Sequence, residues 1–595
     1  MANPVLDDRE IDFLLHDVLD VEQLTKLDHF ADHSRETYDA VVEAARRVAR
    51  DVLFPGYRSL DEQPPVFSEG RIRVADELRP MWERLVELGM ISAARPYEVG
   101  GQQVPLSVLV AAKAWLMAAN AAAYGYVGLT SGAAHLIEEF GSDELREQFM
   151  SRMYSGEWTG TMALTEPHAG SSLGDLASSA SPRDDGTYSI HGSKIFISAG
   201  DHDLTDNIVH LALARIDGAP AGTRGISLFA VPKRRPGPDG ELVDNDVSVT
   251  GMIHKIGWKG LPSLALSFGE RDDCVGWLVG EPNRGLAYMF QMMNEARLMV
   301  GLNGVATAAV AYQESLAYAR ERPQGRSLTD RDPDSPQVPI IEHTDVRRML
   351  LRQKAIVDGG LTLVLTAAMQ ADLAAHGATD QERSRAQRLL DVLTPVVKSF
   401  PAEAGFESNV LAVQVFGGYG YSSEYLPEAW LRDQKLNSIH EGTTGIQSID
   451  LLGRRAMAGE GAGLATLSEA IAGTVQRAAE AGVDLEMCSR MTSAVQELVG
   501  LTADLGVIGA AGEADRMLRH SVDYLDLFSV VVIAWQHLLR AAAAAESTSI
   551  DDAFRDGVQR ATRYWFATEV PRVTLLAERI RSGEDSFATM DPSSF

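Results

Sequence analysis

Residues 188–197 read YSIHGSKIFI, and this stretch decides the fold because its pattern differs from that of the sequence on either side. Apolar and polar residues alternate along it, which predicts a half-buried β-strand. The same period of two returns in ISLFAV at residues 226–231, with Asp and Gly turns between the two stretches. We therefore predict a β-domain between about Glu157 and Gly280.

The sequence before and after this β-domain has the spacing of apolar residues that is typical of helices. Before it, helical patterns run from about Ile11 to Met153 and are interrupted by proline and glycine. After it, a long helix is predicted from Leu286 to about Arg322, where Pro323 stops it. Further helices are predicted over 345–376, over 381–416 and in the last segment, where apolar residues recur at Leu518, Val522, Leu525, Val532 and Trp535.

The order of these patterns predicts a fold that is α+β and mostly α: helical, β, helical, helical. The chain is also too long for a single core. The predicted parts are an N-terminal arm (1–35), an N-terminal helical domain (36–156), a middle β-domain (157–281), a helical bundle (282–455) and an additional C-terminal helical domain (461–595).

Composition excludes several classes of protein. The 595 residues include only two cysteines, so neither a disulfide framework nor a cysteine-rich metal site is expected, and we predict no metal. This cysteine content fits a reducing compartment and predicts a cytoplasmic protein. The N-terminus lacks the basic stretch and apolar run of a signal peptide and is too acidic for a transit peptide, so the mature chain is expected to begin near Met1.

Two further classes are disfavoured by charge and by the length of apolar runs. The longest apolar stretch, at 528–535, is far shorter than the roughly 20 residues that cross a bilayer, so no membrane span is predicted. A formal net charge of −29 repels phosphate backbones, which argues against nucleic-acid binding.

Four clusters have the composition of a ligand site, although each alone also fits a simpler interpretation. MALTEPHAGSS at 162–172 allows close approach to a flat or phosphorylated ligand, or is an ordinary surface turn. KIFISAG at 194–200 places an aromatic ring and a hydroxyl on one strand face, which could wall a flavin ring or belong to the core. QVFGGYGY at 414–421 ends a helix with paired glycines, which also suit a helix C-cap. IHEGTT at 439–444 sets one carboxylate in a short loop, where a lone Glu is usually a solvated surface residue.

In this order and spacing, the four clusters closely resemble the acyl-CoA dehydrogenase family over about residues 41–453. TEP at 165–167 with AGS at 169–171 is similar to its flavin-binding signature, and GG at 417–418 through EGT at 441–443 is similar to its second signature. The resemblance implies a helical N-terminal domain, a middle β-barrel-like domain and a C-terminal helical bundle, assembled as homodimers or dimers of dimers. The N-terminal arm and the tail from about Gly461 resemble a larger subfamily that includes methylmercaptopropionyl-CoA dehydrogenases and long, broad-specificity bacterial enzymes.

The resemblance also implies FAD as cofactor and assigns residues to it by matching position. Thr165 and the backbone near Leu164 would hydrogen-bond the flavin ring, and Ser171 would meet the pyrophosphate. Phe196 would pack on the ring and Ser198 would approach N5. Thr443 would lie beside the cofactor, while the ADP portion of an FAD held by a neighbouring subunit would contact Arg322, Gln414, Gly417 and Gly418.

Within the family pattern, Glu441 is the expected catalytic base. It would remove the α-proton of an acyl-CoA thioester while a hydride passes to the flavin, giving a trans-2-enoyl thioester. Some relatives place the base on the earlier helix, immediately before the arginine that matches Arg297, but here that position is Ala296. Glu295 is one residue away and is rotated from that position by about 100°. Arg297 matches a family arginine near the catalytic loop, and a helix-surface ion pair is its simpler interpretation.

Other functions remain open at this point. An acyl-CoA oxidase would pass electrons to oxygen, whereas a dehydrogenase of fatty acid β-oxidation would pass them to electron-transfer flavoprotein. A flavin-containing DNA-binding damage-response protein shares the fold in one branch, but its basic tail is missing here, because arginines such as Arg516 and Arg540 are scattered among acids. No residue identifies the acyl chain length.

Overall fold

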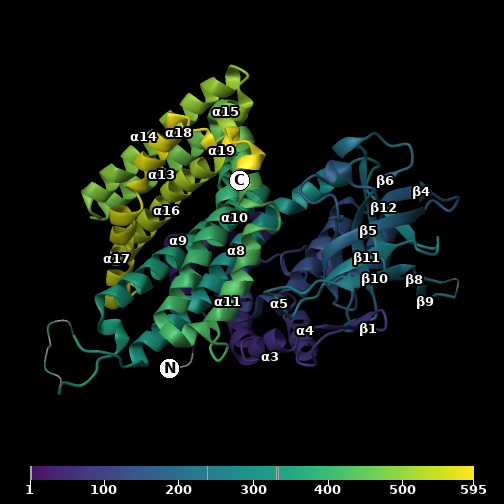
Figure 1. The fold of residues 1–595 in the computed structure, drawn as a ribbon, viewed down its shortest axis with the longest axis horizontal. Coiled ribbons are helices and arrows are strands. Elements are labelled where there is room, and N and C mark those ends of the chain that lie inside the picture. Colours follow the sequence, from purple (N-terminus) through teal and green to yellow (C-terminus); the bar gives the residue numbers. More distant parts are fainter. Residues whose placement is uncertain (1–2, 238, 328, 330–331, 333) are drawn as a thin grey trace. The chain divides into compact units, whose positions relative to one another are not determined.

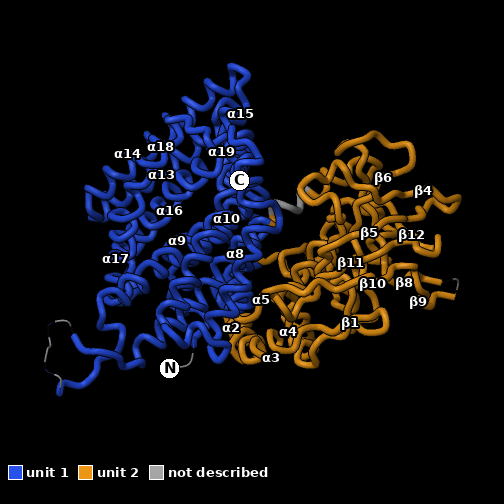
Figure 2. The backbone as a smooth tube through the Cα atoms, in the orientation of Figure 1, with its two compact units in different colours: residues 1–42, 105–118, 297–595 blue, residues 43–104, 119–296 orange. Residues whose placement is uncertain are grey.

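The structure is a computed structural model that describes residues 3–237, 239–327, 329, 332 and 334–595. Met1 and Ala2, the start of the predicted N-terminal arm, lie outside the described residues. Two compact units are present, and each is described by itself (Figure 2). Unit 1 comprises Met1–Val42, Pro105–Ala118 and Arg297–Phe595, and unit 2 comprises Glu43–Val104 and Ala119–Ala296.

Unit 2 contains the predicted β-domain, which is a closed barrel extended by further strands (Figure 1). Strand β5 pairs with β12, which pairs with β7, followed by β6; β4 then pairs with both β6 and β5 and so closes the ring. The barrel-like middle domain is therefore confirmed. The strands of this sheet are β3 (Thr159–Ala163), β4 (Ser179–Pro182), β5 (Tyr188–Ser198), β6 (Ile208–Ile216), β7 (Ile226–Pro232), β10 (Val247–Met252), β11 (Ser263–Phe268) and β12 (Val275–Val279).

The stretch that decides the fold forms β5, and a bulge interrupts it near its C-terminal end. Ile197 pairs with Leu264 of β11, but Lys194 pairs with Leu266, so two residues of β5 face one residue of β11. Phe196 lies in this bulge with φ of +60°, a left-handed conformation that is strained for a bulky side chain. The bulge leaves the Phe196 side chain outside the barrel with 60% of its surface exposed, while Ile197 points into the core.

Short helices and hairpins complete unit 2. The long helix α5 (Leu106–Phe140), of which only residues 119–140 belong to unit 2, is kinked at Asn120, whose φ and ψ of −163° and 88° are not helical. The Asn120 side chain accepts a hydrogen bond from the N–H of Ala123 and so caps the second half of the helix. The other elements here include α3 (Tyr57–Glu62), β1 (Val66–Ser68), β2 (Arg71–Arg73), α4 (Leu78–Glu87), β8 (Arg234–Pro236) and β9 (Leu242–Asp244).

Unit 1 contains the helical bundle, in which α9 and α10 pack along each other. The predicted helices are confirmed almost to the residue, because α8 ends at Glu321, directly before Arg322 and Pro323. Helix α10 continues through Pro395 and Pro401. The bundle elements are α8 (Gly285–Glu321), α9 (Thr344–His376), α10 (Asp380–Phe416), α11 (Pro427–Gln434) and α12 (Thr444–Asp450).

The tail forms further helices around a buried central one, α16, as Figure 1 shows. Helix α16 packs against α13, α14, α17 and α18, and also against α9 and α12 of the bundle. The prediction of an additional helical domain is confirmed. Its helices are α13 (Ala462–Glu480), α14 (Leu485–Ala510), α15 (Ala514–Leu518), α16 (Ser521–Glu546), α17 (Asp552–Thr568), α18 (Arg572–Ser582) and α19 (Ser586–Thr589).

Within the part of the chain that the structure describes, three helices are long and apolar enough to cross a membrane, which the apolar runs of the sequence did not predict. They are α5, α9 and α16, and in their most apolar windows 89%, 83% and 94% of the residues are buried inside the protein. The prediction of no membrane span rested on the length of apolar runs, whereas mean hydropathy over a helix tolerates scattered polar residues. Burial within the protein accounts for the apolar composition of all three.

A buried ion cluster joins the N-terminal arm to α9 and α16. Arg540 is fully buried and its guanidinium pairs with Glu10 of α1 (Asp8–Asp12) and, at 3.2 Å, with Asp358. Asp358 also pairs with Lys354 at 2.8 Å. Because both carboxylates are almost completely buried, each depends on these cations for its charged form.

We expect Arg540→Met to destabilise the protein by about 3–5 kcal/mol, because it leaves the buried Glu10 carboxylate without its counter-charge. Thermal and urea unfolding of the FAD-loaded protein would measure the loss. Arg560→Ala is the matched control, since Arg560 pairs with Asp556 on an exposed face of α17 and should change stability little. Equal losses in the two variants would contradict this role for the cluster.

Candidate functional site

Glu441 lies in a short loop between the 3-10 turn Lys435–Ser438 and the start of α12. Both Glu441 and Gly442 have positive φ, of 53° and 85°, so the loop makes two successive left-handed residues. The fully buried Gln447 of α12 donates to the carbonyls of Glu441, at 3.0 Å, and Gly442, at 3.4 Å. A Cβ at Gly442 would lie 2.7 Å from Gln447 Nε2, so this position suits glycine.

The helical turn before Glu441 is held by buried amide side chains. Asn303 of α8 donates to the side chain of Asn437 at 2.8 Å, and Asn437 donates to Gln434 at 3.3 Å. Gln434 in turn donates to the carbonyl of Pro401 in α10 at 2.8 Å. These amides therefore fix the approach to Glu441 against both α8 and α10.

Two cations act on the Glu441 carboxyl from these same helices. Burial raises the pKa of Glu441 above its usual value, while the charges of Arg297 and Lys398 oppose that rise. Arg297 is buried and donates to Asp450 at 2.8 Å, so the simpler interpretation as a helix-surface ion pair is wrong. The structure thus brings Arg297 to the loop of Glu441.

The first predicted flavin-binding cluster is fixed in unit 2 by a buried ion pair. Lys194 of β5 lies 2.8 Å from Glu166, and it also donates to the carbonyl of Leu164 at 3.1 Å. The N–H of Ile195 donates to the carbonyl of Thr165 at 2.9 Å. Burial favours the neutral acid, but the Lys194 charge and several hydrogen bonds outweigh it and lower the pKa of Glu166 to about 2. Residues 164–166 and 194–196 are therefore held side by side.

The other residues of unit 2 that are predicted to contact the flavin, Ser171, Phe196 and Ser198, are at least partly exposed to solvent. Ser198 is half-buried, and its carbonyl accepts a hydrogen bond from Thr161 at 2.6 Å. Ser171 lies on an exposed loop next to Gly170, where an added Cβ would meet no atom within 4 Å. Phe196 therefore presents an exposed aromatic face on the same strand as Ser198, and the loop of Ser171 is unobstructed.

The predicted contacts for a neighbouring subunit's FAD gather at one exposed place in unit 1. Arg322, which follows α8, lies with its guanidinium carbon 5.6 Å from the ring centroid of Tyr419. Gln414 and the two glycines at 417 and 418 are exposed, and a Cβ on either glycine would meet no atom within 4 Å. Gly417 has φ of +60°, and its N–H caps the carbonyl of Gln414, so the simpler interpretation as a C-cap also holds.

A cavity of about 540 Å³ lies between the bundle and the C-terminal helices of unit 1. Its apolar walls include Phe400 and Trp565, and Thr444 of α12 reaches it and donates to Glu403. The other lining residues are Arg352, Ser399, Ala404, Glu407, Val522, Leu525, Asp526, Ser529, Val530 and Arg572.

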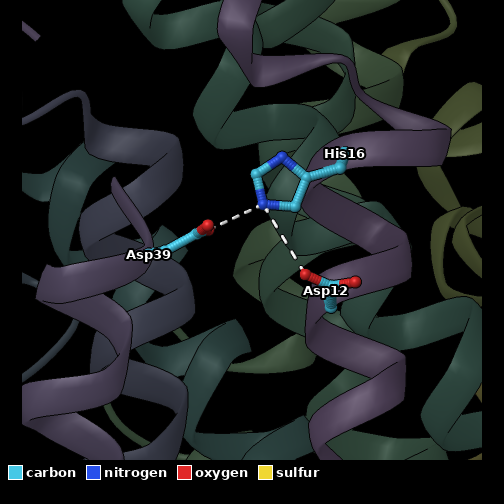
Figure 3. A group of neighbouring side chains, drawn as sticks. All are labelled: Asp12, His16 and Asp39. Atoms are coloured by element: carbon cyan, nitrogen blue, oxygen red, sulfur yellow. Dashed lines mark hydrogen bonds and ion pairs between the residues drawn. The ribbon is translucent and has the colours of Figure 1, made fainter. Parts of the chain in front are cut away.

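One group of described side chains, Asp12, His16 and Asp39, has the spacing of metal ligands, although no metal was predicted (Figure 3). His16 Nε2 lies 2.9 Å from Asp39 and 3.7 Å from Asp12, so direct hydrogen bonding and ion pairing account for the arrangement. The contact ties the N-terminal arm to helix α2 (Arg35–Val48).

Comparison with known families covers nearly the whole chain. Residues 35–157, 161–270 and 283–457 match the N-terminal, middle and C-terminal domain models of acyl-CoA dehydrogenases, and residues 467–591 match the model described as acetyl-CoA dehydrogenase C-terminal like. The chain belongs to the acyl-CoA dehydrogenase family. The 3-methylmercaptopropionyl-CoA dehydrogenase of Ruegeria pomeroyi is 36% identical over 94% of this chain and 95% of its own length.

Two further relatives extend this result. The broad-specificity linear acyl-CoA dehydrogenase FadE5 of Mycobacterium tuberculosis is 32% identical over 98% of both chains. The structure of a Bacillus anthracis acyl-CoA dehydrogenase complexed with FAD superposes with a TM-score of 0.74 at 20% identity, covering 98% of this chain and 93% of that chain. The family and the predicted larger subfamily are thereby confirmed, and the chain is an FAD-dependent enzyme.

The residues present fit this cofactor. The unobstructed glycines at 170, 417 and 418 leave room beside the backbone for a large ligand, and the exposed ring of Phe196 supplies an apolar face. Two hydroxyl groups belong to residues near Phe196. Ser198 is two residues further along β5, and the backbone of Thr165 is hydrogen-bonded to Ile195, the residue before Phe196.

Several supporting residues were missed by the sequence analysis. Gln447 and Asp450 follow Glu441 closely, but their partners are not visible in a sequence because the contacts depend on how the loop turns back. Lys398 did carry a signal, since it is a lone cation among the apolar residues of VVKSF at 396–400. Lys194 and Glu166 lay inside the two quoted motifs, yet nothing in the spacing identified them as a pair.

We expect Glu166→Gln to weaken FAD retention and to destabilise the protein by about 3–5 kcal/mol, because Lys194 would stay buried without a counter-ion. Flavin absorbance after desalting and thermal unfolding would report the two effects. The Glu166 pKa of about 2 lies below the unfolded value of about 4.3, so its contribution is fully present above that value and is lost as pH falls through about 2. The difference between wild type and variant should therefore shrink over that interval, and a difference that is constant with pH would contradict the assignment.

Proposed function

We propose that this enzyme dehydrogenates an acyl-CoA thioester between its α- and β-carbons, with Glu441 as the base that takes the α-proton. The single observation that carries the proposal is the loop geometry: a half-buried carboxylate on a left-handed turn, on which two buried cations act from α8 and α10. When bound, FAD supplies the acceptor for the β-hydride. The product is then a trans-2-enoyl thioester, as in a step of fatty acid β-oxidation.

The backbone around Glu441 supports the same role. Removal of an α-proton develops negative charge on the thioester oxygen, which needs nearby donors. Among the described residues, the Glu441 N–H donates no hydrogen bond within the protein, so it is free to donate to that oxygen. Thr443 instead directs its side-chain oxygen to the N–H of Ile446 and caps α12, which fixes the end of the loop.

Glu295 of α8, the alternative candidate for the base, is paired with a histidine. Glu295 is exposed, and its carboxylate lies 3.4 Å from His135 within unit 2. Ala296, the position before Arg297, carries no acid. These observations favour Glu441 and leave Arg297 to orient and balance the loop through Asp450.

We infer that FAD is bound by Leu164, Thr165, Ser171, Phe196, Ser198 and Thr443, and that a second copy of the chain completes the site. Arg322 and the exposed segment from Gln414 to Gly418 would contact the partner's cofactor, which makes a homodimer the smallest active assembly. The two buried, unpaired cysteines and the bacterial enzymes among its relatives support a cytoplasmic location.

We expect Glu441→Gln to retain bound FAD but to lose turnover by about 10²–10⁴-fold or more, since a positioned general base contributes that much. Anaerobic bleaching of the flavin by added acyl-CoA would measure the reductive step. Glu295→Gln is the matched control and should bleach at close to the wild-type rate. If the Glu441 variant bleaches as fast as the control, the base lies elsewhere.

The electron acceptor and the acyl group can be tested together. We expect rapid turnover with electron-transfer flavoprotein or an artificial acceptor and little peroxide under air; abundant peroxide would identify an acyl-CoA oxidase instead. The panel should include straight-chain acyl-CoAs of graded length and 3-methylmercaptopropionyl-CoA. A preference for the thioether substrate would align this enzyme with the Ruegeria relative, and activity across chain lengths with the mycobacterial one.

A further inference from the structure

Lys398 is a buried cation in the middle of α10. Its side chain is fully buried in α10, and among the described residues its Nζ has no hydrogen-bond partner. An ammonium group out of water is costly unless a nearby negative charge offsets it. Its position therefore calls for a carboxylate at longer range.

The packing of α8 on α10 determines where this cation lies. A Cβ at Gly301 would clash with the carbonyl of Val397, the residue before Lys398. Pro401 has no N–H, so it cannot give that carbonyl its usual helical hydrogen bond. Arg297 lies one turn before Gly301 on α8, so the close approach brings Arg297 and Lys398 to the same region.

The two cations differ in how their charge is balanced. Arg297 has a direct partner, Asp450, which also pairs with Arg454 at 2.5 Å. Lys398 has no such partner, and the carboxylates that act on it are Glu403 on its own helix and Glu441 in the catalytic loop. Glu403 already accepts a hydrogen bond from Thr444, whereas no donor to the Glu441 carboxylate is found among the described residues.

We propose that Lys398 is a positioning residue whose buried positive charge balances the Glu441 carboxylate when an acyl thioester binds and excludes water. This inference rests on the proposed role of Glu441. Arg297 cannot substitute fully, because Asp450 offsets its charge.

The charges that face the two groups are consistent with this role. Glu441 is subject to Arg297 from α8 and Lys398 from α10, and both oppose the rise of its pKa on burial. Burial lowers the pKa of Lys398 to about 8, while Glu403 and Glu441 oppose that fall and Arg297 adds to it. Lys398 therefore carries its charge at neutral pH and loses it above about pH 8.

The test is the pH dependence of anaerobic flavin reduction by a saturating acyl-CoA in wild type, Lys398→Met and Lys398→Arg. We expect the acid limb of the pH–rate profile to lie about one to two pH units higher in Lys398→Met than in wild type, since a nearby opposite charge shifts the pKa of a carboxyl by that order. Below the limb, a one-unit shift reduces the rate tenfold. The rates should converge above about pH 8, where wild-type Lys398 is itself neutral, and Lys398→Arg should restore the limb.

A second measurement does not depend on turnover. Infrared difference spectra of the oxidised protein between low and neutral pH should show the protonated Glu441 carboxyl persisting to higher pH in Lys398→Met, with the band absent in the Glu441→Gln background. Lys398→Gln provides a neutral variant that keeps a polar end if the Met variant fails to fold. Lys354→Met is the matched control, because Lys354 pairs with Asp358 and does not act on Glu441.

The outcomes separate the two ideas. A rate lowered by one constant factor at all pH values, or an unchanged limb in both neutral variants, would overturn the role of Lys398 while leaving Glu441 as the base. Near wild-type bleaching by Glu441→Gln would instead remove the proposed base, and the inference with it. A shifted limb in Lys354→Met as large as that in Lys398→Met would show a general effect of lost stability.

Discussion

The close approach of α8 to α10 is the constraint on which the loop of Glu441 depends. Gly301 and Gly304 permit it, since a Cβ at Gly304 would lie 2.8 Å from the carbonyl of Pro401. Gly405 of α10 permits the same close contact, since a Cβ there would lie 2.9 Å from the carbonyl of Gly304. Larger residues would separate the helices, and the amide chain from Asn303 to Gln434 would lose its geometry. The packing of these two helices therefore determines the geometry of the Glu441 loop.

The C-terminal helices extend the same support from the other side of the loop. Ser448 of α12 lies 3.0 Å from Ser521 at the start of α16, which links the helix after Glu441 to the buried centre of the tail. The cavity lined by Thr444 and Trp565 lies at this junction. Because α12 is only two turns long, its position depends on these contacts more than on its own helical propensity. The tail thus supports the helix that follows the Glu441 loop.

The sequence predicts the elements well and their side-chain partners poorly. Helix α10 and strand β5 were predicted within one residue at each end, because apolar periodicity is local and strong there. The bulge at Phe196 was not predicted, since it depends on how β5 pairs with β11, 65 or more residues later. Arg297 was identified through a motif, but its partner Asp450 is 153 residues away along the chain. Such contacts form only when the bundle closes.

Two residues with central roles in the proposed chemistry, Phe196 and Glu441, have a strained backbone conformation. Phe196 and Glu441 both have positive φ, which costs a bulky residue of order 1–3 kcal/mol, and neither is glycine. In each case the proposed role depends on the side chain itself, as a ring face for the flavin or as a carboxylate for the substrate. Neighbouring contacts hold both conformations: the register of β5 on β11 for Phe196, and the hydrogen bonds of Gln447 for Glu441. A relaxed backbone at either place would reorient the side chain, so the proposed roles depend on the rigidity of the surroundings as well as on the residue itself.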